Sequence, residues 1–228
     1  MRSAKVLFYL FCLFTLLSVL GIFLRFEYLY LVAKTAILPC ILLFYFNKTK
    51  KINYFFLMVL INFYIIDFTL IYENSKLLFY LGILLNINHF FLLITTIQNT
   101  EKLKVDYLTL AFTVFMFLLG FSIHYIIYDL LSLNNINIAL FVIYSSILLC
   151  LFNSLALYNY LMRNSYINFY FGFGCLSIGL TYATYYVYEY VFYLDFIKAC
   201  SLIFQVIAYY LFIKFMLAKE RLILKQKR

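Results

Sequence analysis

Residues 53–72 read NYFFLMVLINFYIIDFTLIY, and this stretch decides the fold class. Its length matches the roughly 20 apolar residues that an α-helix needs to cross a bilayer. The run contains a single carboxylate, Asp67. An ionised carboxylate at the centre of a bilayer costs about 2.5–3.5 kcal/mol, so such groups usually face the interior of a helix bundle. The sequence therefore predicts a membrane helix with an inward-facing Asp67.

The rest of the chain has the same character. Its 228 residues are 67% hydrophobic and 12% charged, whereas soluble domains are about half apolar and about a quarter charged. A water-soluble core cannot absorb this much apolar surface, which predicts an integral membrane protein. The five cysteines form no C-x-x-C pair and there are only two histidines, so we expect no metal site, no disulfide framework and no cofactor.

Polar interruptions divide the chain into apolar runs of bilayer-crossing length. We therefore predict an all-α integral membrane protein, a bundle of about eight transmembrane helices with both termini cytoplasmic. The expected spans are 6–24, 28–46, 53–72, 77–97, 106–128, 135–158, 166–187 and 196–218. Residues 1–218 are expected to form one transmembrane domain, and residues 219–228 a basic cytoplasmic tail that continues the last helix along the membrane surface.

The distribution of positive charge gives the expected orientation. With eight spans, most lysines and arginines lie on the side of the two termini, including Lys48, Lys50 and Lys51, while Arg25 and Lys76 lie on the other side. The positive-inside rule then places both termini in the cytoplasm, and we expect a bacterial inner membrane. The net charge of +9 reflects this topology and attraction to anionic lipid headgroups, so no nucleic-acid partner is expected.

Polar residues inside the spans are the candidate functional residues. Lys34 and Asp67 each lie roughly 8–9 Å from the outer end of neighbouring antiparallel spans, so the sequence predicts an ion pair. Gly82, Asn86 and His89 recur at i, i+4 and i+7 and share one helix face. Purely structural roles for these residues remain open. Lys34 could extend to the headgroups, and Asp67 could be only its structural partner. Asn86 with His89 could form an interhelical contact.

The order of these residues resembles the lysoplasmalogenase family of YhhN-like membrane proteins. The resemblance rests on the segment Ala33–Pro39 with Lys34, on Ile66 and Asp67 late in the next span, and on Gly82 two turns before His89. The family has a Lys-Pro in span two, a Gly-Asp in span three, and a Gly followed by a His in span four. It is similar to this chain over the whole span layout, and in motifs over the first half.

The chain also departs from the family pattern. Thr35 stands where the family has a proline, and Ile66 stands where it has a glycine. A Ser-Asp of span seven falls near Thr181 and Tyr182, so this second carboxylate is absent, while residues 208–210 fit the Tyr-rich last span loosely.

The resemblance implies an intramembrane hydrolase that cleaves the vinyl ether bond of a lysoplasmalogen to a fatty aldehyde and a glycerophospho-base. It implies a membrane lipid or lysolipid as the substrate. We expect Asp67 as the general acid, His89 orienting water or a headgroup oxygen, and Lys34 tuning Asp67 or holding the phosphate. Asn86, on the same helix face as His89, is expected to contribute to substrate binding.

Three other functions fit the same residues. A catalytically inactive relative would bind or sense a lipid in the same cavity. A small-molecule carrier would use Lys34 and Asp67 as a charge-coupled gate, although we see no internal repeat of the kind that carriers show. A structural subunit would need a partner chain for its expression.

Overall fold

The computed structural model describes residues 2–69, 75–100, 106–132, 136–163 and 165–226, and these form eight α-helices. The helices are α1 (Arg2–Phe23), α2 (Glu27–Lys48), α3 (Tyr54–Thr69), α4 (Ser75–Gln98), α5 (Tyr107–Ser132), α6 (Ile136–Arg163), α7 (Tyr166–Tyr190) and α8 (Asp195–Gln226). No described residue lies in a strand. The predicted all-helical fold and the position of every helix are thereby confirmed, although residues 70–72 of the predicted third span and residue 135 of the predicted sixth span lie outside the described part.

Four of the helices are long and apolar enough to cross a membrane. They are the segments Ser3–Phe23, Glu27–Lys48, Ile143–Arg163 and Asp195–Leu224. The described parts of three others are apolar but shorter, Tyr54–Phe68, Gly82–Gln98 and Tyr107–Ser122. Helix α7 is long enough, but its tyrosines and other polar side chains lower its mean hydropathy. The chain is therefore a membrane protein with fewer clearly apolar spans than the predicted eight.

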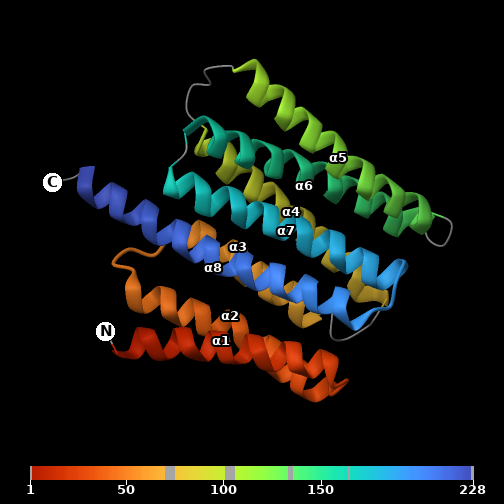
Figure 1. The fold of residues 1–228 in the computed structure, drawn as a ribbon, viewed down its shortest axis with the longest axis horizontal. Coiled ribbons are helices and arrows are strands. Elements are labelled where there is room, and N and C mark those ends of the chain that lie inside the picture. Colours follow the sequence, from red (N-terminus) through yellow and green to blue (C-terminus); the bar gives the residue numbers. More distant parts are fainter. Residues whose placement is uncertain (1, 70–74, 101–105, 133–135, 164, 227–228) are drawn as a thin grey trace.

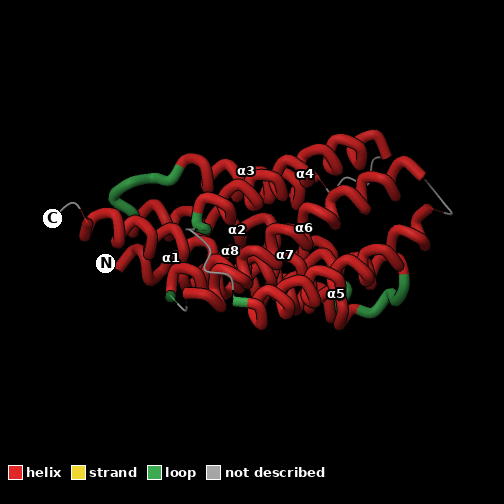
Figure 2. The backbone as a smooth tube through the Cα atoms, turned by 90° about the horizontal axis from the view of Figure 1, so that it is seen from above, coloured by secondary structure: helices red, strands yellow, loops and turns green. Residues whose placement is uncertain are grey.

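The helices pack side by side into one elongated bundle (Figure 1). Helices α1 and α2 form one edge, α5 forms the opposite edge, and α8 runs between the α1–α2 pair and α7. Seen from above, α3 and α4 lie together on one face of the bundle (Figure 2). Helix α1 begins and helix α8 ends at the same end of the bundle, as an even number of crossings requires.

The outside of the bundle is apolar, which is the usual arrangement for a protein in lipid. Helix α5 illustrates it, because Leu108, Phe112, Phe115 and Leu119 recur along one face at helical spacing and are all exposed. The buried core combines aliphatic and aromatic side chains, and in it Phe56 of α3 contacts Phe171 of α7 together with Phe212 and Phe215 of α8. The aromatic rings of this cluster thus serve packing between α3, α7 and α8.

Small residues let α7 approach its neighbours closely. A Cβ at Gly179 would lie 2.9 Å from the side-chain nitrogen of Asn153 in α6. A Cβ at Gly174 would lie 2.7 Å from the ring of Phe212 in α8. These contacts bring α8 close to the centre of the bundle.

Helix α8 continues without a break into the basic tail, so residues 219–226 extend the last helix. Glu220 near its end accepts hydrogen bonds from the backbone amides of Lys50 and Lys51 at 2.7 and 2.9 Å, and from the Thr49 hydroxyl at 2.8 Å. One carboxylate thereby clasps the turn between α2 and α3 to the tail of α8.

Candidate functional site

Asp67 is held by donors from α8. The side-chain nitrogen of Gln205 lies 2.8 Å from each carboxylate oxygen, and the hydroxyl of Tyr209 donates to Oδ2 at 2.8 Å. The same Gln205 nitrogen donates to the Tyr209 oxygen at 3.0 Å. Since an amide nitrogen carries two hydrogens, these three contacts share them. Both oxygens of the carboxylate are therefore engaged by a neighbouring helix.

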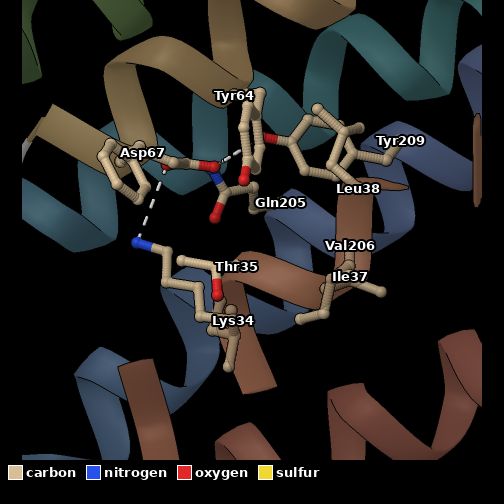
Figure 3. Close-up of a pocket in the computed structure, with 11 residues that line it drawn as sticks. Lys34, Thr35, Ile37, Leu38, Tyr64, Asp67, Gln205, Val206 and Tyr209 are labelled. Carbon is tan, nitrogen blue, oxygen red and sulfur yellow. Dashed lines mark hydrogen bonds and ion pairs between the residues drawn. The ribbon is translucent and has the colours of Figure 1, made fainter. Parts of the chain in front are cut away.

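Lys34 supplies the positive charge of the site (Figure 3). Its Nζ lies 3.6 Å from Oδ1 of Asp67, and the two side chains are only 16% and 18% exposed. The predicted ion pair between α2 and α3 is thus confirmed, and the ammonium group turns toward Asp67. The same Nζ lies 5.7 Å from the centre of the Tyr30 ring one turn earlier, within cation–π range.

A small cavity adjoins this group. Besides the Asp67 carboxylate and its three partners it is lined by side chains of α2, α3 and α8, among them Tyr64 (Figure 3) and Phe68. The free space inside is about 10 Å³, which is close to the minimum that holds one water molecule. Phe68 is 42% exposed and its ring packs against that of Tyr64. One layer of side chains therefore separates the cavity from the lipid side of the bundle.

Local sequence explains why these groups converge. Gln205 and Tyr209 are four residues apart and share a face of α8. Pro39 lies inside α2 and has no N–H, so the carbonyl of Thr35 loses its usual helical donor. Thr35 itself lines the cavity, directly after Lys34. The interruption of helical hydrogen bonding at Pro39 thus lies beside the cavity, where the Thr35 carbonyl group has polar side chains nearby.

His89 lies near the site but outside the cavity lining. It is 1% exposed, and its ring packs against Phe152 at 5.5 Å and edge-on against Tyr182 at 5.3 Å. Tyr182 in turn lies close enough to Asp67 and Tyr209 for their charges to interact. The partly buried Tyr182 of α7 therefore contacts the imidazole of α4 and lies within electrostatic range of the carboxylate of α3.

Asn86 contacts a different helix. Its side-chain nitrogen donates to the Gly82 carbonyl at 2.8 Å, and its oxygen accepts from the Ser145 hydroxyl at 3.0 Å. The structure therefore brings Lys34 and Asp67 together and places His89 against Tyr182, while Asn86 links α4 to α6. Asn86 is absent from the cavity lining, and its observed contacts match the open interpretation as an interhelical hydrogen bond.

Gln205 and Tyr209 are site residues that sequence reasoning did not single out. Gln205 is a primary amide within an otherwise apolar run, and Tyr209 follows it at i+4. This i, i+4 spacing indicates a polar face on α8, but the carboxylate that the two side chains contact depends on how α8 packs. No group of metal-ligating side chains occurs among the residues that the structure describes.

No family model matches the chain, and no curated protein or solved structure matches it either.

Proposed function

We propose that this protein is an eight-span hydrolase of the bacterial inner membrane that cleaves the vinyl ether bond of lysoplasmalogens. The observation that carries the proposal is the environment of Asp67. A carboxylate within an apolar bundle meets one ammonium group and two neutral donors, beside a space of one-water size. The motif resemblance to the lysoplasmalogenase family selects the vinyl ether among the bonds that such an acid could cleave.

The packing of all eight helices into one bundle supports eight crossings. The less apolar α7 lies between α6 and α8, two of the helices that are apolar enough to cross. A helix surrounded by other helices does not need an apolar surface of its own on every side, so its tyrosines are compatible with a membrane crossing.

The chemistry uses Asp67 first as an acid and then as a base. The protonated carboxyl group transfers its proton to the alkene carbon β to the ether oxygen, which leaves an oxocarbenium ion and a carboxylate. Lys34, Gln205 and Tyr209 stabilise the negative charge that develops on Asp67 in this step, and such transition-state stabilisation is what accelerates a reaction. They are thus placed to promote proton release.

Water completes the reaction. One water molecule adds to the oxocarbenium carbon and gives its proton back to Asp67, which restores the acid. The hemiacetal so formed breaks the bond between its carbon and the glycerol oxygen, and its hydroxyl proton passes to that oxygen, which releases the fatty aldehyde and the glycerophospho-base. In this scheme His89 acts through Tyr182, by holding that hydroxyl group beside the carboxylate, and Lys34 balances the charge of Asp67.

Access from the lipid side fits the position of the cavity. A lysolipid chain is too large for a 10 Å³ space, so the vinyl ether has to enter as the rings of Tyr64 and Phe68 separate. The exposed Phe68 already borders the lipid face, and a substrate dissolved in the bilayer would reach it sideways.

The test is aldehyde release from a lysoplasmalogen by the purified protein. The Asp67→Asn variant keeps the size of the side chain and removes the acid, so it should lose activity entirely. The matched control is Asp129→Asn, a carboxylate on the exposed surface of α5, which should retain the wild-type rate. Full activity in Asp67→Asn would refute the catalytic assignment.

A second candidate function, a lipid-binding or sensing protein without turnover, is favoured by Tyr182. In the resembling family a carboxylate falls near this position, and here a phenol occupies it. Wild-type protein that co-purifies with lysolipid in a stable complex and releases no aldehyde would support this candidate over the hydrolase.

A further inference from the structure

A second pocket lies where the α1–α2 turn meets the beginning of α8, at the end of the bundle away from the chain termini. It has a volume of about 200 Å³ and is lined by Arg25, Glu27, Tyr30, Asp195 and Lys198, together with residues 21–22. Pockets that hold drug-sized ligands have volumes of roughly 300–1,000 Å³, so this pocket suits a smaller polar group.

The pocket contains two basic and two acidic residues, and one basic and one acidic residue of these form a salt bridge. Arg25 pairs with Asp195 at 3.2 Å, and its backbone φ of 53° is rare for a residue with a side chain. Lys198 and Glu27 have no ion-pair partner in the described part of the chain. The two acidic and two basic residues sum to zero charge, which favours a ligand that carries one charge of each sign over a simple anion.

Aromatic rings hold Lys198 in place and connect this pocket to the carboxylate site. The Lys198 Nζ lies 4.9 Å from the centre of the Tyr30 ring and 5.3 Å from that of Tyr188. Tyr30 is also the ring beside Lys34. Tyr30 therefore lines this second pocket, called the outer pocket below, and also contacts Lys34 of the Lys34–Asp67 ion pair.

We propose that this outer pocket binds the zwitterionic phosphodiester headgroup of a lysolipid. Lys198 donates to the phosphate, and the Glu27 carboxylate faces the ammonium group. The identification of the ligand as a lysolipid rests on the proposed function, whereas the charge pattern and the pocket do not.

The spacing along α8 agrees with one ligand that reaches both sites. Lys198 and Gln205 are seven residues apart, which is about 10 Å along the helix axis. A glycerol unit and the two side chains can bridge this distance, so a headgroup at Lys198 would place the sn-1 ether of the same molecule near Asp67.

The test measures equilibrium binding of radiolabelled lysophosphatidylcholine to the purified full chain in detergent. This ester-linked lipid has no vinyl ether, so its binding does not depend on hydrolysis. Lys198→Gln should weaken binding at least about tenfold, the effect of losing one charge-assisted hydrogen bond. The matched control is Lys214→Gln, because Lys214 lies over the Tyr210 ring at 5.2 Å on the same helix, away from the pocket.

A second variant reports the ammonium half of the site. Glu27→Gln, at an exposed position, should weaken the binding of lysophosphatidylcholine several-fold and leave that of lysophosphatidylglycerol, which has no ammonium group, unchanged. Wild-type affinity in Lys198→Gln, or equal losses in Lys198→Gln and Lys214→Gln, would overturn the headgroup site. Equal effects of Glu27→Gln on both lipids would overturn the zwitterion assignment.

Competition identifies the source of the headgroup. Displacement by glycerophosphocholine, lost in Lys198→Gln, would show that the headgroup alone is recognised. Displacement by inorganic phosphate to the same extent would contradict the zwitterionic ligand. Lys198-dependent binding without aldehyde release would uphold this pocket and reject the hydrolase, whereas aldehyde release unaffected by Lys198→Gln would uphold the hydrolase and reject the pocket.

Discussion

The Lys34–Asp67 pair predicts a specific pattern of stability losses. At 3.6 Å and an effective dielectric constant of 20, the attraction between two unit charges is about 5 kcal/mol. Desolvation offsets much of this, and removal of one partner from a buried pair costs roughly 3–5 kcal/mol. In Lys34→Met the carboxylate keeps Gln205 and Tyr209 as donors, so we expect a loss at the lower limit, about 3 kcal/mol.

This loss can be measured as a melting temperature in detergent. For a chain of this size 1 kcal/mol shifts the melting temperature by about 2–4 °C, so Lys34→Met should melt about 6–12 °C earlier. The assay is the fraction of protein that remains monodisperse after heating, measured by size-exclusion chromatography. Lys214→Met is the control, and it should change the melting temperature by no more than about 2 °C.

The double variant Lys34→Met/Asp67→Asn decides the cause. It removes both charges at once, so it should recover at least half of the loss seen in Lys34→Met, a coupling of more than about 1 kcal/mol. Losses that add, with the double variant as unstable as the sum of the single variants, would refute the reasoning that the two charges stabilise each other.

Three further predictions concern other parts of the bundle. Gly21→Ala should lower the melting temperature, because its Cβ would lie 2.7 Å from the Tyr30 backbone nitrogen and force α1 and α2 apart. Glu220→Ala should make the turn between α2 and α3 more susceptible to trypsin, measured by limited digestion, because the clasp on residues 49–51 is lost. Asp106, just before the first residue of α5, accepts from the side chain and backbone of Thr109, which lowers the pKa of its carboxyl group below the usual 3.8. Its stabilising effect on the first turn is therefore full above about pH 4 and should disappear as the pH falls through the lowered value, seen as faster hydrogen exchange at Thr109 after correction for the intrinsic rate.

Matched variants test these predictions against simpler explanations. Gly120→Ala places a Cβ 3.2 Å from the sulfur of Cys150, a side chain that can yield, and a loss as large as that of Gly21→Ala would contradict the role of backbone contact. Leu222→Ala removes an exposed side chain of the tail, and trypsin cleavage as fast as in Glu220→Ala would exclude the clasp as the protective element. Asp106→Asn should show no acid-dependent step in the same exchange experiment.

The sequence was sufficient for the helices and for one half of the site. Apolar runs between polar interruptions located all eight helices, because burial in lipid leaves a long and direct signal. The Lys34–Asp67 pair was also predictable, since two consecutive antiparallel spans with charges at equal depth lie side by side. Helix α7 was also located, although it is not among the four helices that are long and apolar enough to cross a membrane.

The other half of the site depends on packing between distant parts of the chain. Gln205 and Tyr209 are far from Asp67 in sequence, and their contact follows from the small residues of α7 that let α8 approach the centre. Nothing in the order of residues states which face of α8 meets α3. For the same reason the position of Tyr182 near both His89 and Asp67 could be found only in the folded chain.

The unbroken length of α8 has a consequence for how this protein can vary. Lys198, Gln205, Tyr209 and Glu220 lie 7, 4 and 11 residues apart, and at 100° per residue they fall within about 60° of one another around the helix. The 32 residues of α8 extend about 48 Å, so one helix carries residues of the outer pocket, the donors to Asp67 and the Glu220 clasp. Insertion or deletion of a single residue between any two of them would rotate one relative to the other by about 100°. A substitution along α8 therefore affects one of these contacts at a time. A change in the length of α8 would instead rotate the outer-pocket residues, the donors to Asp67 and Glu220 out of alignment with one another.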